Sequence, residues 1–170
     1  ISTNAGLWRY IPGDTVMFTS VKPYRIRVTG RTKHFVNAFG EEVVVENTDK
    51  ALAKTCHLLN AMVADYTVAP VYFQGNGKGS HEWLIEFERA PADMNAFSQL
   101  LDANLQKINS DYEAKRHKDI ALECLKIKVL PKGTFHGWLR SKGKIGGQHK
   151  VPRLANHRDH VEEILDFLGE

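Results

Sequence analysis

A turn near the start of the chain places a carboxylate where it could meet a nucleotide. Residues 7–14 read LWRYIPGD, so Asp14 follows a short aromatic stretch and a Pro-Gly turn. An aspartate held in this way can accept two hydrogen bonds from a ribose diol, a recurrent use of acidic residues in nucleotide sites. The alternative is an aspartate that only satisfies the backbone of its own turn.

A second motif lies late in the chain and is both basic and rich in glycine. Residues 143–153 read GKIGGQHKVPR. A lysine delivered on such an arm, Lys150, could neutralise charge that develops on an α-phosphate or on departing pyrophosphate. Pro152 restricts Val151 to extended conformations and so stiffens the segment just after Lys150. A solvated basic loop, or a patch for nucleic acid, is the alternative.

Other polar residues carry weaker signals. Glu41 and Glu42 follow a Phe-Gly pair and could bind a cation or a substrate amine, but a solvated turn is the favoured interpretation. His81 and Glu82 could form an acid–base pair only if they shared a face, and neighbours on a strand point to opposite faces. The eight histidines show no metal-ligand spacing, so we predict no metal site.

The elements that must position these residues follow from hydrophobic periodicity and turn signals. Short aromatic and β-branched segments up to residue 29, separated by Pro-containing turns, predict a small antiparallel β unit. The remainder predicts strand, helix, strand, strand, helix and strand, an order that matches a split βαβ (ferredoxin-like) sheet with helices packed on it. The fold class is therefore α+β. The predicted strands are 42–45, 65–73, 82–88 and 125–130; Asn47 or Thr48 caps the first helix and Asp93 the second, and a short helix and a terminal helix follow.

Composition excludes several classes of protein. The 170 residues are 42% hydrophobic and 25% charged with a formal charge of +3, which is typical of one folded globular domain. No apolar run approaches the roughly 20 residues that span a bilayer, so we expect a cytoplasmic protein with no membrane partner. Cys56 and Cys124 each lie in an apolar periodic segment, which predicts buried reduced thiols. The first residue is Ile1 and not an initiator methionine, which we interpret as the sign of a fragment.

Taken together and in this order, the motifs resemble the auxin-responsive acyl-acid amido synthetases of the adenylate-forming superfamily. Residues 7–14 are similar to the third nucleotide motif of that family, and residues 30–37 with 39–42 resemble the hinge and the loop after it. Residues 148–153 resemble its late lysine motif, and residues 81–88 and 109–112 are similar to bacterial members. The resemblance covers nearly the whole chain.

This resemblance implies a two-step ligase that uses ATP and Mg²⁺. A carboxylic acid and ATP give an acyl-adenylate and pyrophosphate, and an amine or amino acid then attacks the activated carbonyl. By motif matching, Asp14 would bind the ribose, Arg31 would lie near the nucleotide, Lys150 would contact phosphate, and Lys33 would sit in the hinge. Residues 1–32 would end a large N-terminal domain, and residues 33–170 would form a mobile cap that rotates between the half-reactions.

Two departures and two rival interpretations accompany the resemblance. Ile11 and Pro12 replace the Arg-Val common in plant members, and His149 stands where those members have tyrosine. The phosphate loop and acyl-binding helices of the family are absent, so we expect the chain alone to be inactive. One rival is a stand-alone ferredoxin-like module for RNA or a small regulator, and the other is a purely structural domain. The sequence lacks the glycine-aromatic strand signature of RNA-binding sheets. We therefore predict no nucleic-acid partner.

Overall fold

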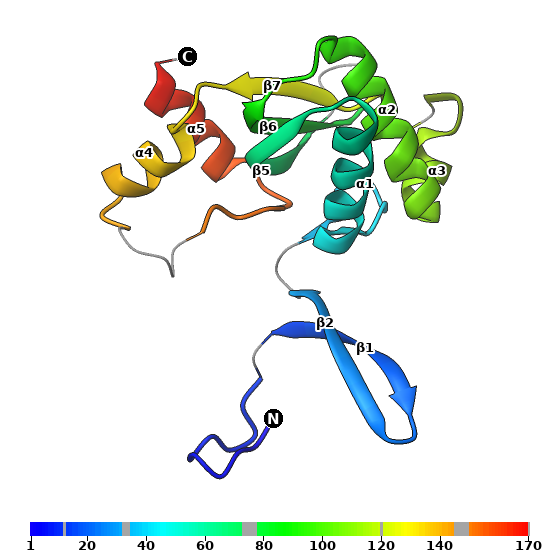
Figure 1. The fold of residues 1–170 in the computed structure, drawn as a ribbon, viewed down its shortest axis with the longest axis vertical. Helices are drawn as coiled ribbons and strands as arrows, with labels where there is room; N and C mark the ends of the chain where they lie inside the picture. Colours follow the sequence, from blue (N-terminus) through cyan, green and yellow to red (C-terminus); the bar gives the residue numbers. More distant parts are fainter. Residues whose placement is uncertain (12, 32–34, 73–77, 120, 145–149, 170) are drawn as a thin grey trace.

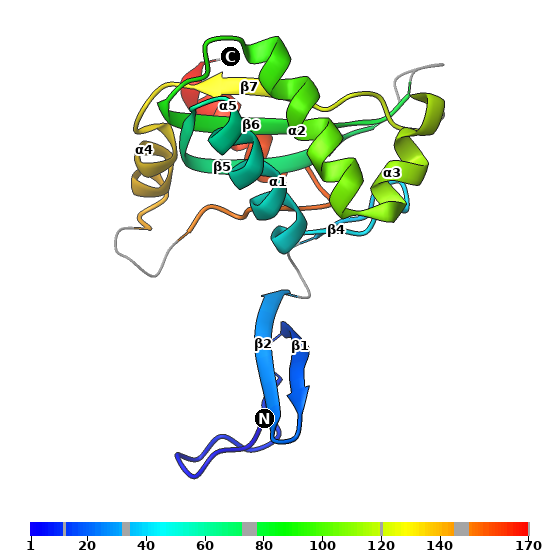
Figure 2. The same cartoon turned by 45° about the vertical axis from the view of Figure 1, so that its right-hand side comes forward.

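The computed structural model describes residues 1–11, 13–31, 35–72, 78–119, 121–144 and 150–169. A hairpin of β1 (Asp14–Val21) and β2 (Tyr24–Arg31) stands away from the larger body, as Figures 1 and 2 show from two directions. The two strands are antiparallel and pair only with each other. An ion pair of 2.9 Å between Arg27 and Glu46 links the hairpin to the first helix of the body.

The body is built on a mixed three-stranded sheet. Its strands are β5 (Met62–Val71), β6 (Ser80–Arg89) and β7 (Lys126–Leu130). The central strand β6 is antiparallel to β5 and parallel to β7. Two further strands, β3 (Phe35–Val36) and β4 (Val43–Val44), form a separate small pair.

Helices cover both faces of this sheet. On one side lie α1 (Val45–Leu58) and α2 (Met94–Ile108), followed by α3 (Ser110–Arg116) and the 3₁₀ turn His117–Asp119; on the other side lie α4 (Thr134–Ser141) and α5 (Asp159–Leu168) (Figure 2). Successive side chains of a strand point to opposite faces, so β6 supplies both cores. Trp83 and Ile85 pack toward α1 and α2, whereas Leu84 packs with Trp138 and Ile164 of α4 and α5.

The second long helix forms where its sequence predicts it. The Asp93 carboxylate accepts hydrogen bonds from the backbone N–H groups of Asn95 (2.8 Å) and Ala96 (3.0 Å), which satisfies two donors that the helix itself cannot. Phe97 and Leu101 are fully buried on one stripe. The first helix begins at Val45, ahead of the predicted cap, and the Asn47 side chain instead accepts the backbone N–H of Val44.

The α+β class, the small antiparallel unit and the mixed sheet with helices are confirmed, and the pairing of two strands differs in detail. β4 pairs with β3 and not with the main sheet. The edge beside β5 is instead met by a late segment, since Val68 N–H donates to Arg153 O (2.9 Å) and Ala155 N–H donates to Val68 O (3.2 Å). Because β6 and β7 are direct parallel neighbours, their βαβ unit is closed and not split. The division of the chain at residue 32 stays a prediction.

None of the helices in the described ranges is long and apolar enough to cross a bilayer.

Candidate functional site

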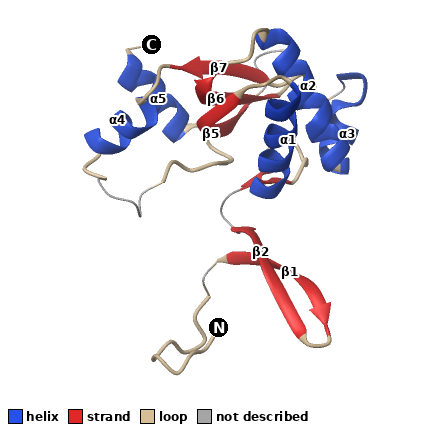
Figure 3. Cartoon of the chain, viewed as in Figure 1, coloured by secondary structure: helices blue, strands red, loops and turns tan. Residues whose placement is uncertain are grey.

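Lys150 begins a segment that is fastened along the edge of β5. We call residues 150–157 the lysine strap; it is drawn as the loop that leads into α5 in Figure 3. The Arg153 guanidinium lies 4.4 Å from the centre of the Tyr66 ring and forms an ion pair with Asp65. Together with the two backbone hydrogen bonds to Val68, these contacts fix the strap just beyond the lysine.

A buried hydroxyl fixes the strap from below. Thr67, fully buried on β5, donates its hydroxyl hydrogen to the carbonyl oxygen of Pro152 (2.6 Å). A threonine hydroxyl has a single hydrogen, so the 2.8 Å contact between Thr67 Oγ1 and His160 Nε2 requires that the histidine nitrogen donate. Burial, and then the neighbouring His157, lower the pKa of His160 from 6.5 to about 4. The imidazole is therefore neutral at physiological pH and serves as a fixed donor.

The far end of the strap is tied to the segment that follows the predicted hinge. The side chain of Asn156 accepts the backbone N–H of Asn37 at 2.7 Å. The carbonyl oxygen of Asn156 accepts the hydroxyl of Tyr72. The strap thus connects the β3–β4 segment with the sheet edge.

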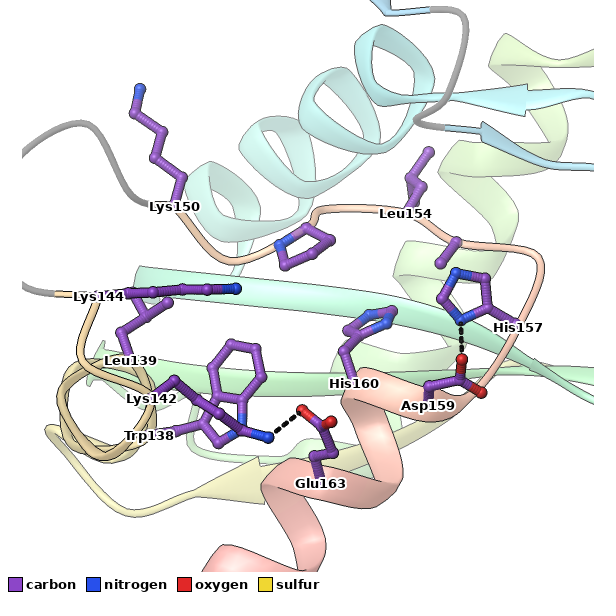
Figure 4. A pocket seen from close by; sticks show the side chains of 12 residues that line it. Trp138, Leu139, Lys142, Lys144, Lys150, Leu154, His157, Asp159, His160 and Glu163 are labelled. Carbon is purple, nitrogen blue, oxygen red and sulfur yellow. Dashed lines mark ion pairs between the residues drawn. The ribbon is translucent and has the colours of Figure 1, made fainter.

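The Lys150 side chain itself is exposed. In Figure 4 it leaves the strap and points away from the cavity beneath it. Within the described ranges, no carboxylate forms an ion pair with it. An ammonium group on a fixed backbone is thereby presented to whatever approaches this side of the body.

The other predicted site residues lie on or next to the hairpin. Asp14, the first residue of β1, is directly opposite Arg31, the last residue of β2, so the backbone brings the two to the same end of the hairpin. Lys33 lies outside the described residues. The structure thus groups Asp14 with Arg31 and places Lys150 on the separate larger body.

Comparison with known proteins decides the family. Residues 46–159, about two thirds of the chain, match the GH3 family C-terminal domain. The chain belongs to the GH3 family. The structure is similar to that of "GH3.15 acyl acid amido synthetase" (TM-score 0.74, 19% identity, covering 97% of this chain and 31% of that chain). It is also similar to "AtGH3.15 acyl acid amido synthetase in complex with 2,4-DB" (TM-score 0.73, 18% identity, with the same coverage).

The chain therefore spans about a third of the length of these solved structures. No curated protein matches it.

The prediction that Glu41 of this GH3 chain is solvated is wrong. Glu41 is fully buried and accepts hydrogen bonds from His81 Nε2 (2.8 Å) and from the backbone N–H of Phe39 (2.7 Å). Burial alone would raise the pKa of Glu41, but the hydrogen bond and charge of His81 lower it overall. Glu82 points to the opposite face, as strand alternation predicts, and pairs with Arg158 at 2.7 Å. No local sequence pattern predicts that Glu41 pairs with His81, forty residues away.

A second buried polar cluster lies next to this pair. The rings of Tyr112 and His81 are tilted relative to each other with their centres 5.3 Å apart, and the Tyr112 hydroxyl donates to Asp102 (2.6 Å). Arg116 donates to both oxygens of the same carboxylate, at 2.9 and 3.0 Å. Burial, followed by the charge of Asp102, raises the pKa of the Tyr112 phenol. These groups satisfy one another inside the body and present no reactive atom to a ligand.

The prediction of buried reduced cysteines is correct only in part. Cys56 and Cys124 form no disulfide, but both are half-buried and not fully buried as predicted. Burial raises the pKa of the Cys56 thiol, which keeps it protonated. Across the described ranges, no three His, Cys, Asp or Glu side chains gather as a metal site.

Proposed function

We propose that this chain is the C-terminal cap of an ATP-dependent acyl-acid amido synthetase. Such an enzyme activates a carboxylic acid as its acyl-adenylate, with release of pyrophosphate, and transfers the acyl group to an amine or amino acid. The observation that carries the proposal is Lys150, an exposed cation held at the start of an anchored strap within the GH3 C-terminal domain. Charge that develops on phosphate needs such a group in a fixed position.

The roles divide between the two parts of the chain. In the proposal, Asp14 accepts hydrogen bonds from the ribose hydroxyls and Arg31 lies near the nucleotide, both at one end of the hairpin. Lys33, in the connection between hairpin and body, serves as the hinge. Rotation there would bring Lys150 to the phosphates for the first half-reaction and withdraw it for the second.

No group of three or more His, Cys, Asp or Glu side chains that could hold a metal lies in the described ranges. Magnesium at nucleotide sites is usually held by one or two carboxylates together with the substrate phosphates. In the proposal, the Mg²⁺ that accompanies ATP would therefore be held largely by the phosphates. ATP, when bound, supplies the adenylyl group and the leaving pyrophosphate.

The exposed surface of the hairpin is evidence for contact with another domain. A protein surface that exposes many large apolar side chains together is usually an interface. Both strands do so. In the proposal this surface packs against the N-terminal domain of the same polypeptide. The exposed side chains are Val16, Met17, Phe18, Val21, Tyr24, Ile26 and Val28.

The rival RNA-binding module loses its main physical support. Sheets that bind RNA stack bases on aromatic side chains of an open face. Here α1 and α2 cover one face of the β5–β6–β7 sheet, and α4 and α5 cover the other. The aromatic residue Trp83 of the central strand is fully buried.

The decisive experiment uses the longer polypeptide that carries this chain. Acid-dependent exchange of pyrophosphate into ATP would be measured across a panel of carboxylic acids for the parent enzyme, Lys150→Ala and Lys126→Ala. Lys126 is an exposed lysine on β7 and serves as the matched control. We expect exchange to fall at least about a hundredfold in Lys150→Ala only, in line with the loss of one charge-stabilising group.

A measurement of the second half-reaction shows whether Lys150→Ala loses exchange through its chemistry or through misfolding. Preformed acyl-adenylate should still react with amine in Lys150→Ala, because the lysine acts only in adenylation. Equal exchange in Lys150→Ala and the parent would remove the assigned role. Absence of exchange with every acid would refute the ligase proposal itself.

A further inference from the structure

A cavity of about 420 Å³ lies between α4, α5 and the lysine strap. Figure 4 shows it from close by, with side chains from all three segments around it. Its apolar wall is formed by Trp138, Leu139, Pro152 and Leu154. Small-molecule sites in proteins span about 300–1,000 Å³ and combine such a wall with a few converging polar groups. The cavity is therefore large enough for an organic ligand.

Lysines dominate the polar part of the cavity. Lys142, Lys144 and Lys150 line it together with the carboxylates of Asp159 and Glu163. Each carboxylate already has a cationic or protonatable partner, because Glu163 pairs with Lys142 at 3.0 Å and Asp159 with a histidine at 3.2 Å. In the described part of the chain no acid pairs with Lys144, so its positive charge is available to an anionic ligand.

Lys144 is held in place by the end of helix α4. Gly143 adopts a left-handed conformation (φ +69°) that terminates the helix. The backbone N–H of Lys144 then donates to Leu139 O (3.0 Å), and that of Gly143 donates to Arg140 O (3.0 Å). This pair of bonds is the Schellman arrangement of a helix C-terminus. From this fixed point the Lys144 side chain extends across the cavity in Figure 4.

Two buried polar atoms in the same wall lack partners among the described residues. The indole N–H of Trp138 donates to nothing described. Nδ1 of His160 has no partner either and, because Nε2 carries the hydrogen, is an acceptor. Leaving such groups unsatisfied costs free energy unless a bound group or a small rearrangement satisfies them. Both atoms are buried, so a ligand in the cavity would reach them only after a small rearrangement of the wall.

We propose that this cavity binds a small phosphate monoester, with the phosphate on Lys144 and the organic group against Trp138 and Leu139. A phosphate monoester carries up to two negative charges, one more than a carboxylate. It can therefore form an ion pair with Lys144, which no described acid pairs with, and also with Lys142 if that lysine leaves Glu163. The phosphate is placed on Lys144 and not on Lys150, which also lines the cavity but points its side chain away from it in Figure 4. The site is thus independent of the adenylation role proposed above.

The test is a titration of the purified 170-residue chain followed through its tryptophan side chains. Phenyl phosphate, inorganic phosphate and benzoate would be added at constant ionic strength, with the indole N–H signals observed by ¹⁵N-labelled NMR. Trp138 reports on the cavity, whereas Trp83 lies in the core on the opposite face of the sheet and serves as the internal control. We expect phenyl phosphate to shift the Trp138 signal saturably and to bind more tightly than either of the other two anions.

Three variants sharpen the assignment. Lys144→Gln should weaken phenyl phosphate binding about tenfold, the usual effect of losing one charged contact, and Lys126→Gln should leave it unchanged. Glu163→Gln should strengthen binding several-fold, because it removes a competing carboxylate and releases Lys142. All three positions are exposed or half-exposed, so folding is preserved.

The proposal fails on any of three results. These are a Trp138 signal that does not shift saturably with phenyl phosphate, equal affinities for the chain and Lys144→Gln, and benzoate binding as tight as that of phenyl phosphate.

Discussion

The neutral buried imidazole of His160 should make the stability of this chain depend on pH in a defined window. His160 has a pKa of about 4 in the folded chain against 6.5 as a free side chain. Below pH 6.5 the unfolded chain gains a proton that the folded chain cannot accept until the pH falls to about 4. Stability from this histidine is thus fully present above pH 6.5 and is lost as the pH falls through that window.

The size of the effect follows from the two pKa values. One pKa unit corresponds to about 1.4 kcal/mol. Between about pH 7.5 and about pH 5, the difference between 6.5 and about 4 amounts to a loss of about 2 kcal/mol in the free energy of unfolding. The cause is burial of the ring, reinforced by the positive charges of His157 and Arg158 and opposed by Asp159 and Glu163.

His160→Gln is the variant that isolates this contribution. A glutamine amide can still donate to Thr67 but cannot titrate. Urea unfolding at both pH values should show a pH dependence about 2 kcal/mol smaller in His160→Gln than in the original chain. Groups shared by the two proteins cancel in the difference. Glu41 is one of them: its lowered pKa stabilises the fold at both pH values, and this contribution is lost only at more acidic pH.

His57→Gln is the control, because the His57 side chain is exposed on α1 and is not among the groups that shift the pKa of His160. Its pH dependence should follow that of the original chain. Parallel pH profiles for His160→Gln and the original chain would refute the reasoning, whatever the absolute stability of the variant.

Three further changes test the contacts that hold the body together. Glu41→Ala should lower the free energy of unfolding by roughly 3 kcal/mol, because it leaves a buried His81 without its partner. Gly79→Ala should cost roughly 1–3 kcal/mol, since a Cβ there would lie 2.3 Å from Cζ of Phe39, and Phe39→Leu in the same chain should recover part of the loss. Thr67→Val should cost about 1–3 kcal/mol and speed tryptic cleavage of the strap, because it removes the hydroxyl that holds a strap carbonyl.

Two surface variants serve as controls when the free energies of unfolding are measured with urea. Glu123→Ala and Thr19→Val alter exposed side chains and should stay within about 0.5 kcal/mol of the original chain. A Glu41→Ala loss no larger than that of Glu123→Ala would contradict the buried pair. A strap cleaved at the same rate in Thr67→Val and Thr19→Val would show that the hydroxyl does not anchor it.

The elements that sequence could predict are those specified by their own residues. The predicted stripe of α2 buries Phe97, Leu101 and Leu105 and half-buries its two other apolar side chains, β6 is buried on both faces, and Asp93 caps its helix as its type and place predict. Both patterns are local, because a strand or helix repeats its contacts every few residues. The partner of β4 was not predictable in this way, since a two-residue strand carries no register information.

Buried polar residues were the least predictable part of the site. Glu41 has the sequence context of a turn, and its turn is real, but the carboxylate folds inward to a histidine on β6. The energy that selects this arrangement comes from a pairing across forty positions, which no window of neighbouring residues contains. Strand alternation could exclude Glu82 as the partner of His81 and could not supply the correct one.

The segment after Lys150 is held by contacts that only the fold supplies. The sequence attributes stiffness after the lysine to the ring of Pro152, which restricts Val151. In the structure, Pro152 contributes a carbonyl oxygen to Thr67, and the strap makes its edge bonds through Arg153 O and the N–H of Ala155. A proline fits at this place because none of these bonds needs its missing N–H. The residues that follow the lysine thus fix the strap beside it. In the proposed ligase, we expect changes at Thr67 or Arg153 to slow acid-dependent exchange of pyrophosphate into ATP through the placement of Lys150 and not through contact with ATP.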